Sequence, residues 1–272
     1  MRPQPWIDGS LLVAAAALAA APGAAALAPY APLGAIALLH VWGAAVPRSG
    51  YFLRVHWRLP PGCPGLALTF DDGPHPEITP RLLDLLAAAR QQATFFVIGE
   101  HARAHGALLR RMRAEGHALG LHSDRHDRFL AARSTATVRR DLERCAAAIA
   151  EATGAPAPRL FRPPIGIKSP SVARAVAQLG LCTVTWSCRG LDGVARADPA
   201  RVLARLARGI APRAILTLHD GHEPGRPFDR SACLVVTAEL LPRLSAAGCA
   251  SRALVVAGEE IGLANPLQGS ER

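Results

Sequence analysis

From residue 65 onward, short apolar runs alternate with longer segments whose apolar residues recur at helical spacing. Short apolar runs between polar turns are typical of buried strands, and strands separated by helices predict βα units around a parallel sheet. Seven or eight such units can close as a barrel. The predicted strands are 66–70, 94–98, 118–121, 160–161, 182–186, 215–218 and 253–256, and the predicted helices are 79–89, 107–115, 135–152, 169–179, 199–208 and 232–247.

Two uncharged runs precede this region. Residues 10–28 are dominated by alanine and leucine and are about long enough to cross a bilayer, whereas residues 33–46 are short for a span. A two-helix membrane hairpin, a single anchor and a cleaved signal peptide all remain open. We expect four parts: membrane-anchoring segments over 1–47, a linker over 48–64, the folded domain over 65–258 and a C-terminal tail over 259–272.

The charges around these runs predict where the protein is located. Residues 29–32, between the two runs, carry no charge, whereas Arg48, Arg54 and Arg58 follow the second run. Basic residues next to membrane segments tend to stay on the cytoplasmic side. We therefore expect a protein of the bacterial inner membrane whose folded domain faces the cytoplasm. A periplasmic-facing or secreted domain is the alternative, if only the first run spans or if a signal peptide is cleaved.

Arginine accounts for nearly all of the basic residues behind the formal charge of +10, because Lys168 is the only lysine. Arginine suits anionic partners such as phospholipid head groups and sugar phosphates. A high-GC genome produces the same bias, so composition leaves both explanations open. The sequence has no nucleic-acid-binding motif, and nucleic acid is not an expected partner. The six cysteines form no CxxC pair and no zinc-ligand spacing, which favours buried free thiols.

Polar side chains follow several of the predicted strands. Asp71 and Asp72 come at the end of the first one, and Gly73-Pro74 is expected to end it so that both carboxylates turn the same way. His122 and His126 follow another strand at a spacing of four, which on one helical turn aims both imidazoles at one ion. One carboxylate and two histidines leave positions open for water and substrate, as a catalytic metal site requires. Zinc fits this set, and cobalt, iron or another divalent ion would also be accepted.

Five short segments, in this order and spacing, resemble the polysaccharide deacetylases, which contain the NodB-like domain of carbohydrate esterase family 4. The resemblance spans roughly Gly65 to Val256, and it implies an irregular, incomplete (β/α) barrel of about seven units. The segments are Thr69-Phe70-Asp71-Asp72-Gly73-Pro74, His122-Ser123-Asp124-Arg125-His126, Arg162-Pro163-Pro164-Ile165-Gly166, the stretch from Trp186 to Asp192, and Leu216-Thr217-Leu218-His219.

The resemblance also implies roles for individual residues. The positions that match the family's metal ligands are Asp72, His122 and His126. The positions that match its catalytic groups are Asp71 as the base, Arg162 as the group that orients it, His219 as the general acid and Asp192 as the carboxylate that adjusts it. The positions that match substrate contacts are Ile165, whose N–H would help hold the oxyanion, and Leu216 and Leu218, candidates for the acetyl-methyl pocket.

Two positions depart from the family pattern. Ile165 stands where a tyrosine is common, and Gly193 stands where a tryptophan usually lines the sugar groove. Both changes predict a substrate of different shape. The expected function is metal-dependent removal of the N-acetyl group from an acetylamino sugar in a poly- or oligosaccharide or lipid-linked glycan, with membrane lipid as a further partner. An O-acetyl ester, a formamide or a non-carbohydrate amide remains an alternative substrate, and a non-catalytic glycan-binding protein is the second function. The sequence does not indicate an oligomeric state.

Overall fold

The computed structural model describes residues 30–264. The chain divides into two compact units, Met1–Trp42 and Gly43–Arg272. The described part of the first unit is mostly helix α3 (Ala31–Ala45), which runs into the start of the second unit. The second unit contains all the other described elements, and it is the unit in which the predicted site residues lie.

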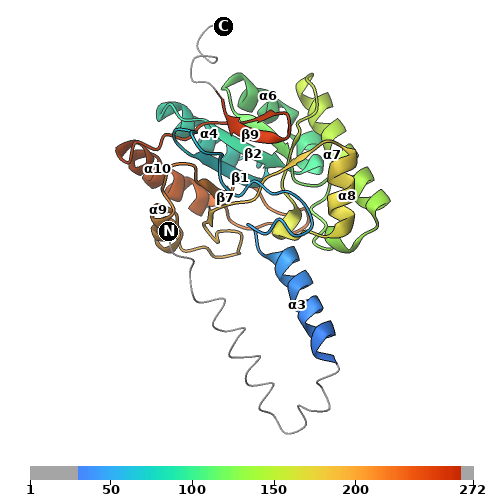
Figure 1. The fold of residues 1–272 in the computed structure, drawn as a ribbon. Helices are drawn as coiled ribbons and strands as arrows, with labels where there is room; N and C mark the ends of the chain where they lie inside the picture. Colours follow the sequence, from blue (N-terminus) through green and yellow to red (C-terminus); the bar gives the residue numbers. More distant parts are fainter. Residues whose placement is uncertain (1–29, 265–272) are drawn as a thin grey trace. The chain divides into compact units, whose positions relative to one another are not determined.

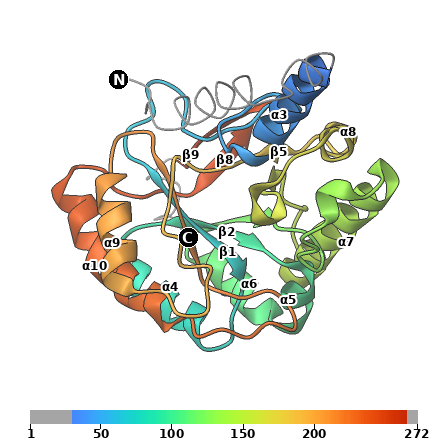
Figure 2. The ribbon, with the colours of Figure 1, turned by 90° about the horizontal axis from the view of Figure 1, so that it is seen from below.

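Seven parallel strands form the central sheet of the second unit (Figures 1 and 2). Their order is β5-β4-β3-β2-β1-β7-β6, so the first strand lies near the middle and pairs with β2 on one side and β7 on the other. The strands are β1 (Ala67–Gly73), β2 (Ala93–Val97), β3 (Ala118–Leu121), β4 (Leu160–Phe161), β5 (Cys182–Thr183), β6 (Cys188–Arg189) and β7 (Ile215–His219).

The two ends of this sheet belong to one short stretch of chain. Strands β5 and β6 are joined only by residues 184–187. The N–H of Val184 donates to the Phe161 carbonyl in β4, and the N–H of Ser187 donates to the Ile215 carbonyl at the start of β7. The single segment 182–190 therefore passes from one edge of the curved sheet to the other. This arrangement agrees with the irregular α/β barrel of about seven strands that the sequence predicted.

Helices cover the outer face of the sheet, as Figures 1 and 2 show. Several begin at residues that satisfy the free N–H groups of a first turn: Ser134 and Ser169 accept through Oγ, and Asp198 accepts two N–H groups and is followed by proline. The helices are α4 (Ile78–Ala88), α5 (Gly99–Ala104), α6 (Gly106–Ala114), α7 (Thr135–Thr153), α8 (Pro170–Gln178), α9 (Pro199–Arg208) and α10 (Ser231–Ala246), with short 3₁₀ turns η2 (Leu130–Ala132) and η3 (Pro164–Gly166).

Apolar side chains pack in two clusters because successive strand residues point to opposite faces. Phe70 and Leu68 of β1 belong to the large cluster between sheet and helices, whereas Ala67 belongs to a smaller one near the strand starts. An antiparallel hairpin, β8 (Leu254–Ala257) and β9 (Glu260–Leu263), contributes to the smaller cluster. The apolar run at 253–256 was thus predicted correctly as a strand, but it pairs with β9, inside the expected tail, rather than joining the barrel.

The prediction of a membrane-spanning segment before the barrel is corrected by the structure. No helix within residues 30–264 is long and apolar enough to cross a membrane. Helix α3 has 15 residues, which at about 1.5 Å per residue gives roughly 22 Å, short of the ~30 Å hydrocarbon core of a bilayer. The first run, residues 10–28, lies outside the described residues, and the location of the protein stays a prediction.

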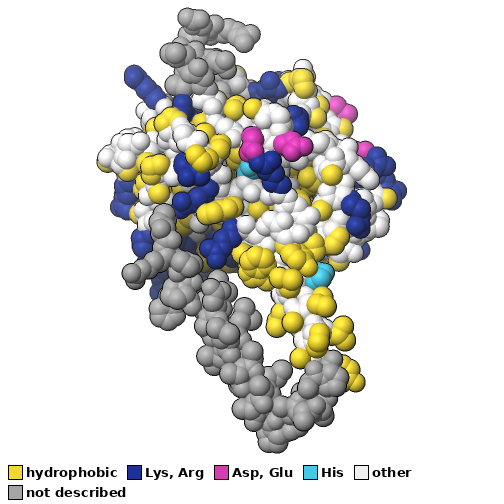
Figure 3. Space-filling model, viewed as in Figure 1, with side chains coloured by type: hydrophobic (Ala, Val, Ile, Leu, Met, Phe, Trp, Pro, Cys, Tyr) yellow, Lys and Arg dark blue, Asp and Glu magenta, His cyan; other side chains and the backbone are white. Residues whose placement is uncertain are grey.

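Two features of composition can be followed in the structure. All six cysteines are free thiols; four are buried as expected, whereas Cys63 and Cys188 are only partly buried. Basic side chains gather over α9 and α10 at the left of Figure 3, where the exposed arginines of α9 are Arg201, Arg205 and Arg208.

Candidate metal and catalytic site

The two adjacent aspartates reach the same cavity because β1 contains a bulge. Asp71 pairs with Phe96, but Val97 pairs with Gly73, so Asp72 is the extra residue of the ladder. Asp72 has a left-handed backbone with φ of 68°. A bulge re-aims side chains that would otherwise alternate across the sheet. The strand ends at Gly73, as the Gly73-Pro74 pair predicted, but the bulge within the strand is what turns Asp72 towards the cavity that Asp71 faces.

Asp72, His122 and His126 come together as a cluster in which three potential ligand atoms lie within 4.8 Å of one another. Asp72 Oδ1 lies 3.4 Å from Nε2 of His122 and 3.4 Å from Nε2 of His126. All three side chains are buried, and Asp72 Oδ1 has no hydrogen-bond partner within the described residues. Because a buried, unpaired carboxylate oxygen is costly, this oxygen facing two imidazole nitrogens fits a bound divalent cation.

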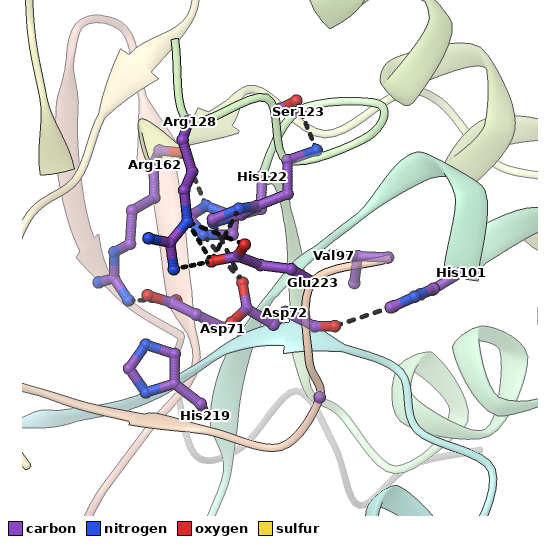
Figure 4. A network of polar contacts seen from close by, with 12 residues as sticks. Asp71, Asp72, Val97, His101, His122, Ser123, Arg128, Arg162, His219 and Glu223 are labelled. Atoms are coloured by element: carbon purple, nitrogen blue, oxygen red, sulfur yellow. Dashed lines mark hydrogen bonds and ion pairs between the residues drawn. The ribbon is translucent and has the colours of Figure 1, made fainter. Parts of the chain in front are cut away.

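The two histidines do not lie on a helical turn, which corrects the sequence-based explanation of their spacing. Residues 122–126 form a loop in which Ser123 and His126 have φ of 72° and 54°. The Ser123 hydroxyl accepts from the N–H of His126 at 3.0 Å and holds this loop closed. The Nδ1–H of His122 donates to the Arg162 carbonyl at 2.8 Å, leaving Nε2 towards Asp72 (Figure 4). The spacing of four therefore brings both rings to one point through a tight loop.

Burial and neighbouring charges shift the pKa values of the three cluster residues in different directions. Burial would lower the pKa of His122, but the charges of Asp71 and Asp72 raise it. Burial would raise the pKa of Asp72, but the nearby His122 imidazole and the charge of His219 hold it well below its ordinary value. Burial, and then the charge of His122, lower the pKa of His126 to about 4. Asp72 is therefore ionised and His126 neutral at neutral pH, which leaves both free to act as ligands.

The second aspartate is held by a buried arginine. Arg162 is fully buried, and its Nη1 donates to Asp71 Oδ1 at 2.6 Å and to Thr69 Oγ1 at 2.8 Å. Its Nη2 donates to the Thr185 carbonyl at 3.0 Å, and its guanidinium lies 4.0 Å from the centre of the Phe96 ring. With its donors used on several sides, the guanidinium cannot turn, so it fixes the Asp71 carboxylate beside the cluster (Figure 4).

His219, at the end of β7, forms the other polar pair. Its Nδ1–H donates to Asp192 Oδ1 at 2.9 Å, and Asp192 Oδ2 accepts from the backbone N–H of His219 at 2.8 Å. Burial would lower the pKa of His219, but the charge and hydrogen bond of Asp192 and the charges of Asp72 and Asp71 raise it to about 9. The imidazole is therefore a cation at neutral pH that can release a proton from its exposed side.

Asp71, Asp72, His122, His126 and His219 line one cavity of about 230 Å³, whereas Arg162 and Asp192 do not line it. Ile165, which is 45% exposed in turn η3, lies on its wall as expected. Leu216 and Leu218 do not line it: both are fully buried in the cluster between sheet and helices. Because β7 alternates, Thr217 and His219 face the cavity instead. The predicted contact of the two leucines with an acetyl methyl group was wrong.

The cavity is open beside His219 because residue 193 is a glycine. A Cβ at this position would lie 3.2 Å from Cε1 of His219. A large side chain, such as the tryptophan common in the family, would need to shift the ring or the loop. Gly193 therefore leaves the part of the cavity next to His219 accessible.

Sequence reasoning missed two residues of this cavity, Arg128 and Glu223. Arg128 donates to both carboxylate oxygens of Glu223, whose Oε1 lies 3.6 Å from Nδ1 of His126. The two residues are 95 positions apart in different loops, and no spacing in the sequence connects them. Figure 4 shows the Glu223 carboxylate above Asp72, with the Arg128 guanidinium beside it.

Comparisons with known proteins match most of this chain to carbohydrate deacetylases. A family profile described as polysaccharide deacetylase matches residues 58–184. A chitooligosaccharide deacetylase of Sinorhizobium fredii is 37% identical over 212 residues, covering 75% of this chain and 96% of that protein. A peptidoglycan-N-acetylglucosamine deacetylase of Bacillus cereus is 31% identical over 202 residues, covering 74% and 89%. The solved structure of a family 4 carbohydrate esterase from Streptomyces lividans, with acetate, superposes with a TM-score of 0.64 at 26% identity, covering 75% and 99%.

Proposed function

We propose that this chain, which belongs to the polysaccharide deacetylase family, removes the acetyl group from an N-acetylated amino sugar with the help of a divalent metal. Membership of this family makes it a carbohydrate deacetylase; the metal, the individual roles and the sugar are our proposal. The observation that carries it is one cavity lined by the Asp72–His122–His126 cluster, by Asp71, which Arg162 holds, and by His219, which Asp192 holds.

The metal would be held by Asp72 Oδ1 and by Nε2 of His122 and His126. A divalent ion at this position would act as a Lewis acid: it would polarise the acetyl carbonyl and lower the pKa of a bound water. Two nitrogens and one oxygen suit zinc, and cobalt or iron would also accept this set. The fit rests on the buried oxygen of Asp72 that lacks a hydrogen-bond partner among the described residues.

Asp71 and His219 divide the proton transfers between them. Asp71, held in place by Arg162, accepts the proton of the attacking water. His219 is a cation at neutral pH, so it donates a proton to the amine that leaves when the amide C–N bond breaks. The N–H of Ile165, on the cavity wall, is available to the oxyanion of the intermediate. Water adds to the acetyl carbon, and acetate and the free amino sugar result.

The substrate we propose is an N-acetylglucosamine-type glycan. Relatives at 37% and 31% identity are named for chitooligosaccharide and for peptidoglycan N-acetylglucosamine. Gly193 opens the wall next to His219, and Ile165 removes an aromatic hydroxyl, so the sugars flanking the acetylated one would be bound differently from those of relatives with tryptophan and tyrosine. A lipid-linked glycan is compatible with the exposed apolar side chains of Ile165, Leu191 and Val194 on the cavity wall.

The test compares acetate release from N-acetylated chitooligosaccharides and from matched O-acetylated sugars. We expect the metal-free protein to be inactive and zinc or cobalt to restore release from the N-acetyl substrate. His126→Ala should bind metal poorly, while His105→Ala, a histidine outside the cavity lining, should behave like the wild type. Full activity of the metal-free protein, or release from esters alone, would refute the proposal.

A further inference from the structure

The carboxylate of Glu223 is held in a fixed position at the metal cluster. Arg128 donates to it three times, from Nε to Oε1 and Oε2 at 2.9 Å each and from Nη2 to Oε1 at 2.7 Å. The Glu223 side chain is 14% exposed, whereas that of Arg128 is 45% exposed. A planar guanidinium bound to both oxygens sets the direction of the carboxylate as well as its charge.

The loop that carries Glu223 is held at the residues just before it, Asp220 and Gly221. Thr79 donates through its hydroxyl to Asp220 Oδ2 at 2.6 Å, and the buried Arg230 donates through Nε to the Gly221 carbonyl. Gly221 itself lies against the backbone carbonyl of Asp72, where a Cβ would overlap. These contacts place the loop directly over the end of β1, so the position of Glu223 does not depend on Arg128 alone.

The carboxylate faces the one cluster imidazole whose second nitrogen lacks a partner. Nδ1 of His122 is engaged by the Arg162 carbonyl at 2.8 Å. Nδ1 of His126 is buried, has no hydrogen bond within the described residues, and lies 3.6 Å from Glu223 Oε1. The two ligand histidines therefore have the same arrangement, Nε2 towards Asp72 and Nδ1 towards an oxygen, but the oxygen comes from the backbone in one case and from Glu223 in the other.

We infer that Glu223 is a positioning residue for His126, and that the Arg128–Glu223 pair sets the metal affinity of the cluster through it. This inference rests on the proposed metal site. A carboxylate acting on Nδ1–H fixes the tautomer of a ligand histidine, aims Nε2 at the ion and makes that nitrogen more basic. A shift of a few tenths of an ångström brings 3.6 Å within hydrogen-bond range.

A purely structural role for the pair would have a different signature. An ion pair with a half-exposed arginine contributes little to folding stability. Removing it should therefore leave the unfolding temperature of the metal-free protein nearly unchanged. If the pair acts on His126, metal affinity should change without such a loss of stability.

The experiment measures the affinity of the purified full chain for Zn²⁺ and Co²⁺ by competition with a chelator, without substrate. We expect Glu223→Gln to weaken binding by about 10–100-fold and to alter the visible absorption of bound Co²⁺, which reports ligand geometry. Glu223→Asp keeps the charge on a shorter side chain, so its metal affinity should lie between those of the wild type and Glu223→Gln. Glu143→Gln removes the carboxylate of another exposed pair, with Arg139 on α7, and should bind metal like the wild type.

A double variant separates positioning from simple charge. Removing the Glu223 carboxylate leaves the Arg128 cation near the metal site, and this positive charge would repel the metal ion. If that repulsion were the cause, Glu223→Gln combined with Arg128→Gln would recover wild-type affinity, and the inference would be overturned; we expect the double variant to stay weak. Wild-type affinity in Glu223→Gln would overturn it as well. If the wild type itself bound no metal, the proposed function would fail instead.

Discussion

Replacing Asp192 by asparagine should move the alkaline limit of activity to lower pH. The carboxylate contributes to the raised pKa of His219 through both its charge and its hydrogen bond to Nδ1. Asparagine keeps the shape but removes the charge, so only the charges of Asp72 and Asp71 remain to offset the burial that opposes a cationic ring. The pKa of His219 should then fall from about 9 towards the ordinary value of 6.5.

The size of the effect follows from the fraction of His219 that is protonated. At pH 8, a group with a pKa of about 9 is roughly nine-tenths protonated, whereas one at 6.5 is about 3% protonated. If protonated His219 is the acid, activity at pH 8 should fall about 30-fold for this reason alone, but by less than about twofold at pH 6. Any loss from poorer orientation of the ring is the same at both values, so the ratio between them isolates the protonation effect.

The assay is kcat/KM for acetate release across pH 5.5 to 10, with the His219 ring titrated in parallel by NMR. Asp198→Asn makes the same change in charge at a surface position, the N-cap residue that precedes α9, and should leave the profile unchanged. An alkaline limit of Asp192→Asn at the same pH as in the wild type would show that this limit does not report His219. The acid role assigned to that residue would then be wrong.

Three other predictions concern the base, the metal cluster and the loop over β1. Asp71→Asn should retain metal but lose turnover by roughly 10²–10⁴-fold, because the amide cannot accept the water's proton; turnover within tenfold of the wild type would exclude Asp71 as the base. His126→Ala should lose bound metal, measured by elemental analysis, yet remain folded by circular dichroism; retention of one equivalent of metal would contradict the proposed ligand set. Gly221→Ala should lower the free energy of unfolding by about 1–3 kcal/mol in urea titrations, because its Cβ would overlap the Asp72 carbonyl; an unchanged midpoint would mean that the loop can shift.

The sequence by itself determined the order of the elements and the chemistry at the strand ends. The helix expected at 199–208 and the strand at 118–121 have the observed bounds, since apolar periodicity depends on local geometry that the sequence displays directly. Parallel strands bring their carboxyl ends to one edge, so Asp71, Asp72 and His219 could be placed together from their positions along the chain.

Only the tertiary structure decided how these side chains meet. The bulge at Asp72 and the left-handed residues of the 122–126 loop depend on neighbouring strands and loops, which no local pattern encodes. The pairing of Arg128 with Glu223 joins two loops far apart in the chain, and charge alone does not say which of many arginines approaches which carboxylate.

The leucines of β7 show the same division within a single strand. The run Leu216-Thr217-Leu218-His219 indicated a buried strand, and it is one. Which face looks into the cavity was settled by the register of β7 against β1, where Asp71 pairs with His219 and Thr69 with Thr217. A strand has two faces with a period of two, and packing of one face under the helices sends Leu216 and Leu218 to the core and leaves the threonine and the histidine to the cavity.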